Sequence, residues 1–594
     1  MVDALHHRGP DDGGVAAGDG WAIGMRRLAI IDLSAAGHQP MASGDHVLVF
    51  NGEVYNFAEL REELAALGHP FRGGSDTEVV LEAFREWGPA ALDRFNGFFA
   101  LCVVDTRRRV AWLARDRFGK KPLFLARLRG RLLFASELKA MLPLCRDEVT
   151  LDRAALAAYL RYQYVPGPSS ILREVEKLPP ASWLEVDLET GQTGEPQIYW
   201  QPPAPDAALP AATPGEVLDV VREATARRMV ADVPVGAFLS GGTDSSLVVA
   251  CMRDASEDVR TFAIGFREGT YDESGYAAAV AQHLGTRHTT FTLSGDETLK
   301  ALPAFVEAFD EPFADSSAIA TYAVARLARQ HVTVALTGDG GDELFGGYTR
   351  YQGVGARAEQ IERVPRAAAP VLALGRHLPR VGPRLDVLAS AVRLGTAAAA
   401  YRETVSIWRT PDLRRLVPDA PEHDALLDTF DAAAGGPVER LMRCDIATYL
   451  VDDILQKVDR ATMAVSLEAR NPLLDPAVVA VALRSTRYAE EGPGRKPLLR
   501  DALRLVLPDA LVDRPKMGFT VPHTAWLRGE LKDLLHDLVL SGPDELYRRS
   551  TARSVNRRLA GGSRLAGHQL WCLLVFELWR DHWLRGRPLP ALAA

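Results

Sequence analysis

The sequence has few cysteines, no long apolar run and no excess of positive charge. The five cysteines in 594 residues have no metal-site spacing, which is typical of thiols that fill the core of a protein in a reducing compartment. No apolar run approaches a membrane span, and the N-terminus has no signal-peptide hydrophobic region. The formal net charge of −8 does not indicate a nucleic acid or a membrane as partner. We therefore expect a cytoplasmic globular protein with several domains.

The most informative motif is a glycine-rich run, Ser240 to Ser246, after the apolar stretch 233–239. This order predicts a strand, a tight turn and a helix whose first N–H groups can bind an anion. Asp244 would repel a phosphate unless a divalent cation lies between them. No Gly-Lys-Ser/Thr closes the run, so it is not a Walker P-loop. A Ser-Gly-Gly turn alone could be only a helix cap, but the full pattern resembles the pyrophosphate loop of the ATP pyrophosphatases.

Two further loops carry acidic residues. The run 337–348 follows an apolar stretch and contains several glycines with Asp339, Asp342 and Glu343. One carboxylate could complete a magnesium site with Asp244, and another could orient an amine or a substrate acid, although an acidic surface turn is the alternative. The run 309–317 clusters acids and hydroxyls beside a helix start, where capping alone could explain them.

The pattern of apolar stretches predicts two halves. Residues 1 to about 145 contain compact apolar runs with helical patterns between them, which favours a mixed α/β sandwich. The Pro/Ala-rich stretch 201–215 indicates a linker. Later strands alternate with helices, which predicts a doubly wound parallel sheet with ligand at its carboxyl end. From about residue 356 the pattern is mostly helical. The strands are expected at 47–50, 98–104, 110–114, 132–135, 233–239, 261–266, 288–293 and 332–336.

Taken together, the motifs resemble those of the glutamine-dependent asparagine synthetases over nearly the whole chain. Besides the three loops, they include the run Asp452 to Asp475 and the run Arg514 to Pro522. The resemblance implies an N-terminal-nucleophile αββα sandwich at 1–200, a linker at 201–215 and an ATP-pyrophosphatase domain with a helical C-terminal part at 216–594. It also implies that the carboxylate of aspartate attacks ATP to give β-aspartyl-AMP, from which ammonia displaces AMP.

The resemblance assigns roles in the ligase half. Asp244 and Asp342 would bind Mg²⁺, and Lys496 would stabilise charge on the α-phosphate in the transition state. Asp339 would line the acyl-adenylate site, where the family often carries Glu. The residues implied to bind ATP are Leu239, Ser240, Gly241, Gly242, Asp244, Ser245, Ile264, Gly265, Thr337 and Gly338.

Motifs in the first 80 residues resemble those of the class II glutamine amidotransferases. They imply that Asn51 and the Gly52 amide form an oxyanion hole. Arg27 would pair with the α-carboxylate of glutamine, and Glu53 and Asp76 would take its α-ammonium. Each residue taken alone could equally be a turn or capping residue.

The nucleophile of that family is an N-terminal cysteine, whereas this chain begins Met1-Val2-Asp3. Cys102 lies in an apolar run and is expected to be a core residue of a strand. The chain as given is therefore expected to use ammonia rather than glutamine. A truncated start and a synthetase-only homologue, as in the β-lactam synthetases, both explain the difference. We favour truncation, because the oxyanion and glutamine-binding motifs are complete.

Other functions stay open at this point. The same machinery could act on another carboxylate in a polysaccharide or natural-product pathway, which the residues of 311–317 and 468–471 would decide. Asn471 stands where a more apolar residue is expected. A non-catalytic nucleotide-binding homologue is disfavoured by intact Asp244, Asp342 and Lys496, and a tRNA-modifying enzyme by the acidic balance. A homodimer is left open.

Overall fold

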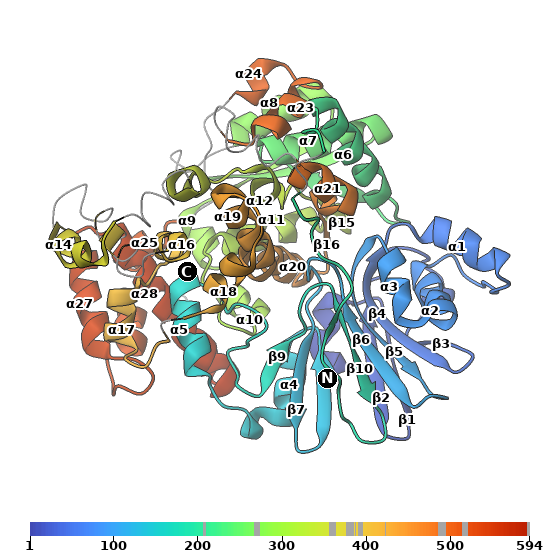
Figure 1. The fold of residues 1–594 in the computed structure, drawn as a ribbon, viewed down its shortest axis with the longest axis horizontal. Coiled ribbons are helices and arrows are strands. Elements are labelled where there is room, and N and C mark those ends of the chain that lie inside the picture. The colour runs from blue at the N-terminus through green and yellow to red at the C-terminus, as the bar shows by residue number, and fades with distance from the viewer. Residues whose placement is uncertain are drawn as a thin grey trace.

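The computed structural model describes the chain outside residues 206–208, 267–273, 356–363, 376–384, 386–387, 390–391, 393–395, 422, 485–494, 514–520 and 591–594. Most of the predicted motif at Arg514 to Pro522 therefore lies outside the described residues. In the remainder, the chain forms an antiparallel β-rich N-terminal half and a parallel α/β half with many additional helices (Figure 1).

A six-stranded sheet organises the N-terminal half, in the order β11-β10-β6-β5-β4-β3, with antiparallel neighbours throughout. Alternate residues of a strand face opposite sides of its sheet. Leu101 on β5 therefore packs with the helical layer α1 and α2, whereas Cys102 packs with β2 and β7. The strands are β3 Met41–Ser43, β4 His46–Val54, β5 Gly97–Asp105, β6 Val110–Arg115, β10 Ser182–Asp187 and β11 Gln197–Ile198, and the helices are α1 Phe57–Ala66 and α2 Asp76–Trp87.

Two smaller antiparallel sheets form the second β layer, β1-β2 and β8-β7-β9. The layers are thus helices, sheet and sheet, and α4 Leu138–Cys145 follows β8. This arrangement agrees with the predicted α/β sandwich. The strands of this layer are β1 Asp12–Gly18, β2 Trp21–Arg27, β7 Phe124–Leu128, β8 Arg131–Ala135 and β9 Val175–Lys177, and η1 Val2–Arg8 and α5 Arg153–Tyr162 flank the half.

The second half is built on a five-stranded parallel sheet in the order β14-β13-β12-β15-β16. Val334 and Leu336 of β15 pack with the helices of one face, and Ala335 between them packs with the helices of the other. The strands are β12 Val235–Phe238, β13 Arg260–Phe266, β14 Arg287–Leu293, β15 Val334–Leu336 and β16 Glu468–Arg470. The first helical layer contains α6 Pro214–Arg228, α7 Thr243–Ala255, α8 Ser274–Leu284, α21 Pro476–Arg484 and α23 Pro497–Arg504, and the second contains α11 Ser317–Ala328 and α20 Gln456–Met463.

The last third of the chain agrees with the mostly helical pattern that the sequence predicts and adds one strand to it. The region after residue 356 is mostly helical where it is described, but β16 is a strand at the edge of the parallel sheet. It has only three residues, all of them buried, so neither alternation nor length marks it in the sequence.

The other helices are α9 Gly295–Leu299, α10 Leu302–Ala308, α12 Gly341–Phe345, α14 Ala369–Leu374, α16 Ala397–Val405, α17 Thr410–Leu416, α18 Ala425–Ala432, α19 Pro437–Ala447, α24 Asp509–Val512, α25 His523–Trp526, α26 Lys532–Leu535, α27 Arg549–Ala560 and α28 Arg564–Trp579.

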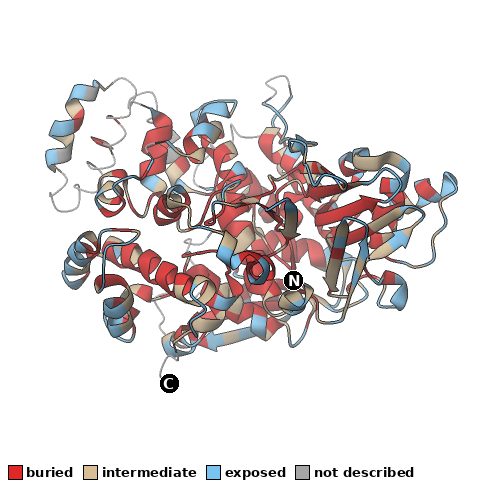
Figure 2. Cartoon of the chain, turned by 90° about the horizontal axis from the view of Figure 1, so that it is seen from below, coloured by how far each residue is buried: buried red, intermediate tan, exposed pale blue. Residues whose placement is uncertain are grey.

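The two halves meet through buried ion pairs. Nη1 of Arg8 lies 2.8 Å from both a Glu137 oxygen and an Asp459 oxygen, and Lys121 Nζ lies 3.1 Å from Glu468 Oε2. Figure 2 shows that buried residues occupy the middle of the molecule and exposed ones its periphery. Because separating such pairs would leave buried charges without partners, the two halves are held in one arrangement.

Candidate active sites

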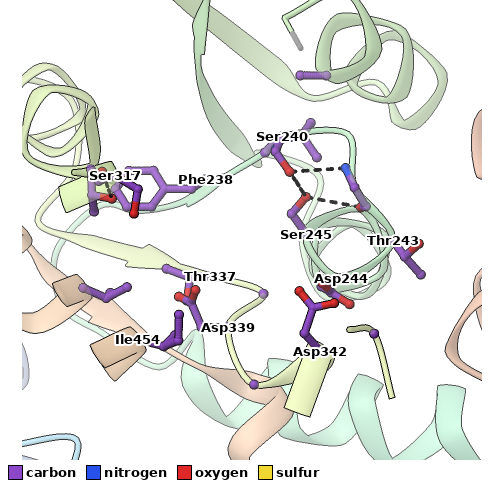
Figure 3. Close-up of a pocket in the computed structure, with 18 of the residues that line it drawn as sticks. Phe238, Ser240, Thr243, Asp244, Ser245, Ser317, Thr337, Asp339, Asp342 and Ile454 are labelled. Atoms are coloured by element: carbon purple, nitrogen blue, oxygen red, sulfur yellow. Dashed lines mark hydrogen bonds between the residues drawn. The ribbon is translucent and has the colours of Figure 1, made fainter. Parts of the chain in front are cut away.

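A cavity of about 620 Å³ lies at the carboxyl end of the parallel sheet. The glycine-rich loop after β12 and the acidic loop after β15 form facing walls of it (Figure 3). Parallel sheets place their ligands at this edge, because the loops that follow the strands meet there. The residues on its walls that the sequence nominated are Leu239, Ser240, Gly242, Asp244, Ser245, Ile264, Thr337, Gly338, Asp339, Asp342 and Lys496.

The first loop is held in a turn by its own serines. Ser245 Oγ accepts from Ser240 N and donates to Gly242 O, both at 3.3 Å. Gly241 has φ +68°, and a Cβ there would lie 2.7 Å from the backbone of Tyr276. Only glycine fits both conditions. The N-terminus of α7 therefore lies on the cavity wall, where unpaired N–H groups can bind an anion.

Lys496 joins the two carboxylates that the sequence assigned to a metal. Its Nζ lies 2.8 Å from Asp342 Oδ1 and also contacts Asp244 Oδ2. Burial opposes its charge, but the two carboxylates outweigh burial and raise the pKa of Lys496. Two acidic side chains thus already share a cation, which is the chemistry that a divalent metal bound to phosphates would need. The residues present fit Mg²⁺ as the resemblance implies.

The two loops approach closely at Gly338. A Cβ at Gly338 would lie 2.7 Å from both Asp244 Cβ and Ser245 N, so a side chain there would push the loops apart. The next residue, Asp339, lies in the cavity wall, and its Oδ2 accepts from Thr337 Oγ1 at 2.6 Å. Asn471 Nδ2 lies 3.3 Å from the same oxygen. Asn471 belongs to the run 468–471 that is expected to select the acceptor, and its contact with Asp339 depends on β16.

Further charged side chains lie in or beside the cavity wall, and sequence reasoning gave them no individual role, although Asp315 and Glu343 belong to the two acidic loops. Lys457 on α20 pairs with Asp315 at 2.9 Å. Tyr348 donates to Glu343 at 2.6 Å, and burial with the nearby Asp342 charge raises the pKa of Glu343 to about 7. The sequence offered only their membership of long motifs as a signal, because none of them follows a recognisable spacing.

Two residues assigned to ATP binding do not line the cavity. Gly241 serves the turn described above, and Gly265 lies within β13, where it is paired with Thr292 of β14. Both lie next to lining residues, Ser240 and Ile264 respectively.

The residues assigned to glutamine converge on a second, much smaller cavity of about 40 Å³. That volume is close to the space of a single water molecule. Arg27 donates to the carbonyls of Ile31 at 3.0 Å and Asp32 at 2.6 Å. Asn51 Nδ2 donates to Ser136 Oγ at 3.3 Å. A Cβ at Gly52 would lie 2.0 Å from Phe98 O, so any side chain at this position of β4 would collide with the backbone of β5.

Glu53 and Asp76 are both buried, and their carboxylates interact electrostatically. Burial raises the pKa of Asp76 to about 6, although the Val54 N–H donates to it, and burial with the Asp76 charge raises the pKa of Glu53 well above its usual range. Arg470 of the ligase half lies 3.5 Å from Glu53 Oε1.

No cysteine in the described chain is placed as a nucleophile. All five are buried, and burial raises the pKa of Cys102 to about 12. A thiol needs a lowered pKa and access to act as a nucleophile. Cys102 is the strand core residue that its apolar run predicted. It lies in the wall of a separate cavity of about 560 Å³ between the two β layers, which Asn51 also lines.

The described part of the chain contains no ready-made cluster of metal ligands and no helix suited to crossing a membrane. No group of three or more His, Cys, Asp and Glu side chains is gathered as a metal site in the described part of the chain. Asp244 and Asp342 would therefore need phosphate oxygens or waters to complete a coordination shell. No described helix is long and apolar enough to cross a membrane.

Comparison with known families and proteins agrees with this geometry. The asparagine synthase family model matches residues 216–581, and the glutamine amidotransferase domain model matches residues 1–200. Asparagine synthetase [glutamine-hydrolyzing] 1 of Bacillus subtilis is 32% identical over 618 residues, covering 99% of this chain and 94% of its own. A Mycobacterium bovis relative, whose name also carries asparagine synthetase [glutamine-hydrolyzing], is 35% identical over 620 residues with the same coverage.

Among solved structures, a glutamine phosphoribosylpyrophosphate amidotransferase from B. subtilis matches 44% of this chain and 60% of its own length. Its TM-score is 0.26 and its sequence identity 16%, so the likeness carries no argument here.

Proposed function

This chain belongs to the asparagine synthase family, and on that premise we propose that it converts aspartate into asparagine with ATP through β-aspartyl-AMP. One observation carries the proposal: Asp244, Asp342 and Lys496 meet at the carboxyl end of the parallel sheet, in one cavity with Asp339. We also propose the division into an amidotransferase-like domain at 1–200, a linker at 201–215 and a synthetase domain at 216–594.

The first step is adenylation of the acceptor. A carboxylate oxygen of aspartate attacks the α-phosphorus of ATP, the bond to the β-phosphate oxygen breaks, and pyrophosphate leaves. The loop from Ser240 to Ser245 and the start of α7 bind the pyrophosphate. Asp244 and Asp342 would hold Mg²⁺, which would supply charge neutralisation to the phosphates. Lys496 then turns its ammonium from the carboxylates to the α-phosphate, where negative charge builds in the transition state.

The second step forms the amide. The nitrogen of ammonia attacks the acyl carbon, and the bond to the phosphate oxygen breaks, so that AMP leaves. Asp339 accepts a proton from the attacking nitrogen, which becomes the neutral amide. Its position suits this role, because Thr337 holds one carboxylate oxygen and Asp339 lines the cavity.

For the nitrogen source, we propose that the chain as printed uses ammonia. All five cysteines are buried, and the pKa of the Cys102 thiol is raised. No thiol is therefore available as the nucleophile that would form a tetrahedral intermediate at Asn51 and Gly52. Glutamine serves only where an N-terminal cysteine stands beside these donors. Arg27, Glu53 and Asp76 then hold the substrate, after Arg27 leaves the carbonyls of Ile31 and Asp32.

The test is product stoichiometry. Purified protein with ATP, Mg²⁺, aspartate and ammonium should give AMP, pyrophosphate and asparagine in equal amounts. Release of ADP would contradict the adenylation chemistry. Glutamine without ammonium should give no asparagine and no glutamate.

A second candidate is ligation at another carboxylate in a polysaccharide or natural-product pathway. The observation that favours it is the polar contact of Asn471 with Asp339, which changes the polarity of the acceptor end. Pyrophosphate release that depends on a carboxylate other than aspartate would select it. A non-catalytic nucleotide-binding homologue would release no pyrophosphate with any acceptor.

A further inference from the structure

Two adjacent residues at the end of strand β16 contact two different sites. Arg470, its last residue, is fully buried, and its guanidinium lies 3.5 Å from Glu53 Oε1 in the proposed glutamine site. Asn471 follows directly and is also fully buried. Its Nδ2 donates to Thr337 Oγ1 at 2.7 Å and lies 3.3 Å from Asp339 Oδ2 in the ligase cavity. A single peptide unit therefore separates the two sites.

The backbone of this pair is held tightly. Thr337 N donates to Arg470 O at 2.8 Å, which extends the pairing of β15 with β16. Arg470 Nη1 donates to the carbonyls of Arg228 at 2.9 Å and Val230 at 2.7 Å. Its Nε donates to Glu468 at 2.8 Å. A displacement of Arg470 is thus passed to Thr337 through a main-chain bond.

The contact between Arg470 and Glu53 is the longest of the polar contacts that these two residues make. The Arg470 Nη2 atom and the Glu53 Oε2 atom are buried and have no hydrogen-bond partner in the described structure. The attraction between the two groups is electrostatic and unsupported by a good hydrogen bond at 3.5 Å. A second cation placed at Glu53 would compete with Arg470 for that carboxylate.

We propose that Arg470 and Asn471 couple the two sites, so that glutamine held at Glu53 and Asp76 changes the position of the Asp339 side chain. The α-ammonium of glutamine weakens the attraction of Glu53 for Arg470, and Asn471 carries the resulting shift to Thr337 and Asp339. Asn471 is in this sense a positioning residue. The inference rests on the proposed function, because it needs an active ligase cavity and a glutamine-binding site.

The experiment measures ligation at saturating ammonium, ATP and Mg²⁺ while glutamine is added as an effector. Saturating ammonium removes any contribution of glutamine as a nitrogen source, and glutamate is measured to check this. Glutamine should change kcat/KM for aspartate about fivefold, the lower range of typical coupling between sites. Calorimetry should give the reciprocal effect, with aspartate and a non-hydrolysable ATP analogue changing the Kd of glutamine.

Three variants separate coupling from stability. Asn471→Leu keeps a similar volume and removes the donor, so glutamine should bind with unchanged Kd but no longer alter ligation. Arg470→Lys keeps a charge with a different reach and should change the size of the effect. Arg228→Lys is the matched control, because Arg228 is equally buried and lies 4.6 Å over Tyr55 at the same contact, but its ion pair is with Asp475. It should retain the glutamine effect.

The coupling is overturned if glutamine does not bind, if it binds without altering ligation, or if Asn471→Leu keeps the wild-type effect. Loss of the effect in Arg228→Lys would also overturn it, since general loosening of the contact would then be enough. Should Asn471→Leu not fold, Thr337→Val removes the hydroxyl that Asn471 contacts and should abolish the effect as well. Absence of AMP in the wild type contradicts the proposed function instead.

Discussion

Each half of the molecule brings together a pair of carboxylates, partly exposed in the ligase half and buried in the N-terminal half, and the two pairs differ in what lies between them. Asp244 and Asp342 share the ammonium of Lys496. Glu53 and Asp76 interact with each other directly, and burial raises the pKa of both. Two like charges in a low dielectric need a cation or a proton between them. Asp244 and Asp342 can therefore exchange the Lys496 ammonium for another cation. Glu53 and Asp76 can exchange a proton for an organic ammonium.

The largest effect is expected from removing a charge of the first pair. Asp244→Asn should lower pyrophosphate release by about 10³-fold, because metal-assisted neutralisation contributes several kcal/mol. Asp254→Asn, on the same helix but exposed and paired with Arg222, is the control and should stay near wild type. Near-normal turnover in Asp244→Asn would contradict a metal-binding role for Asp244.

Removing the cation between these carboxylates tests Lys496. Lys496→Met should lower adenylation about 10²-fold, as loss of a transition-state donor does, with little change in the Kd of ATP. Pyrophosphate exchange and equilibrium dialysis measure the two quantities. Arg504→Met on the same helix is the control, since Arg504 pairs only with neighbouring surface acids. Weaker ATP binding with unchanged turnover would be the contrary result.

The second pair predicts a pH dependence of glutamine binding. The pKa of Asp76 is raised to about 6, so a proton occupies the pair below that pH, and the α-ammonium must displace it. The Kd of glutamine should therefore rise by up to about tenfold per pH unit as pH falls below 6, measured by calorimetry. In the ligand-free chain the sign agrees: the raised pKa favours folding at low pH, and this stabilisation is lost as pH rises through 6.

Asp76→Asn provides the comparison for that profile. It should bind glutamine weakly with a flat pH dependence, because no carboxylate then titrates at that position. A wild-type Kd that does not change between pH 5 and 7.5 would show that the pair is ionised in the free protein.

The smallest effect concerns a lysine without a carboxylate at bonding distance. Lys120 is buried, its Nζ has no hydrogen-bond partner in the described structure, and burial lowers its pKa to about 8. The unfolded chain binds this proton more tightly, so stability should rise with pH between about 8 and 10.5. Lys120→Met removes the cost below pH 8 and should raise the thermal midpoint by a few degrees at pH 7, with a smaller gain at pH 9.5.

Lys121→Met is the matched control, because Lys121 is the next residue and pairs with Glu468. It should lower the thermal midpoint, since Glu468 would lose a buried partner. Equal changes in both variants would show that pairing does not decide stability at this contact.

Much of the architecture follows from local pattern. Apolar runs between turn signals predicted the strands on which both sites depend, and all eight expected strands overlap observed strands, with ends that differ by four residues at most. The stretch 332–336 shortened to Val334–Leu336, and 233–239 to Val235–Phe238, because hydrogen-bond pairing and not apolarity ends a strand. The other eight strands, β1, β2, β3, β7, β9, β10, β11 and β16, were not predicted, and the three buried residues of β16 carry no period that distinguishes strand from helix.

The sequence by itself determined which residue types are present for the chemistry: glycines that allow close approach, carboxylates for a cation and a cysteine set unsuited to attack. Only the tertiary structure decided their partners. Lys496 meets Asp244 across 252 positions, and Asn471 meets Asp339 across 132. Such meetings depend on strand order and on packing between halves, which follow from burial summed over many distant residues. No local spacing encodes that sum, so the contacts that link the two sites are visible only in the folded chain.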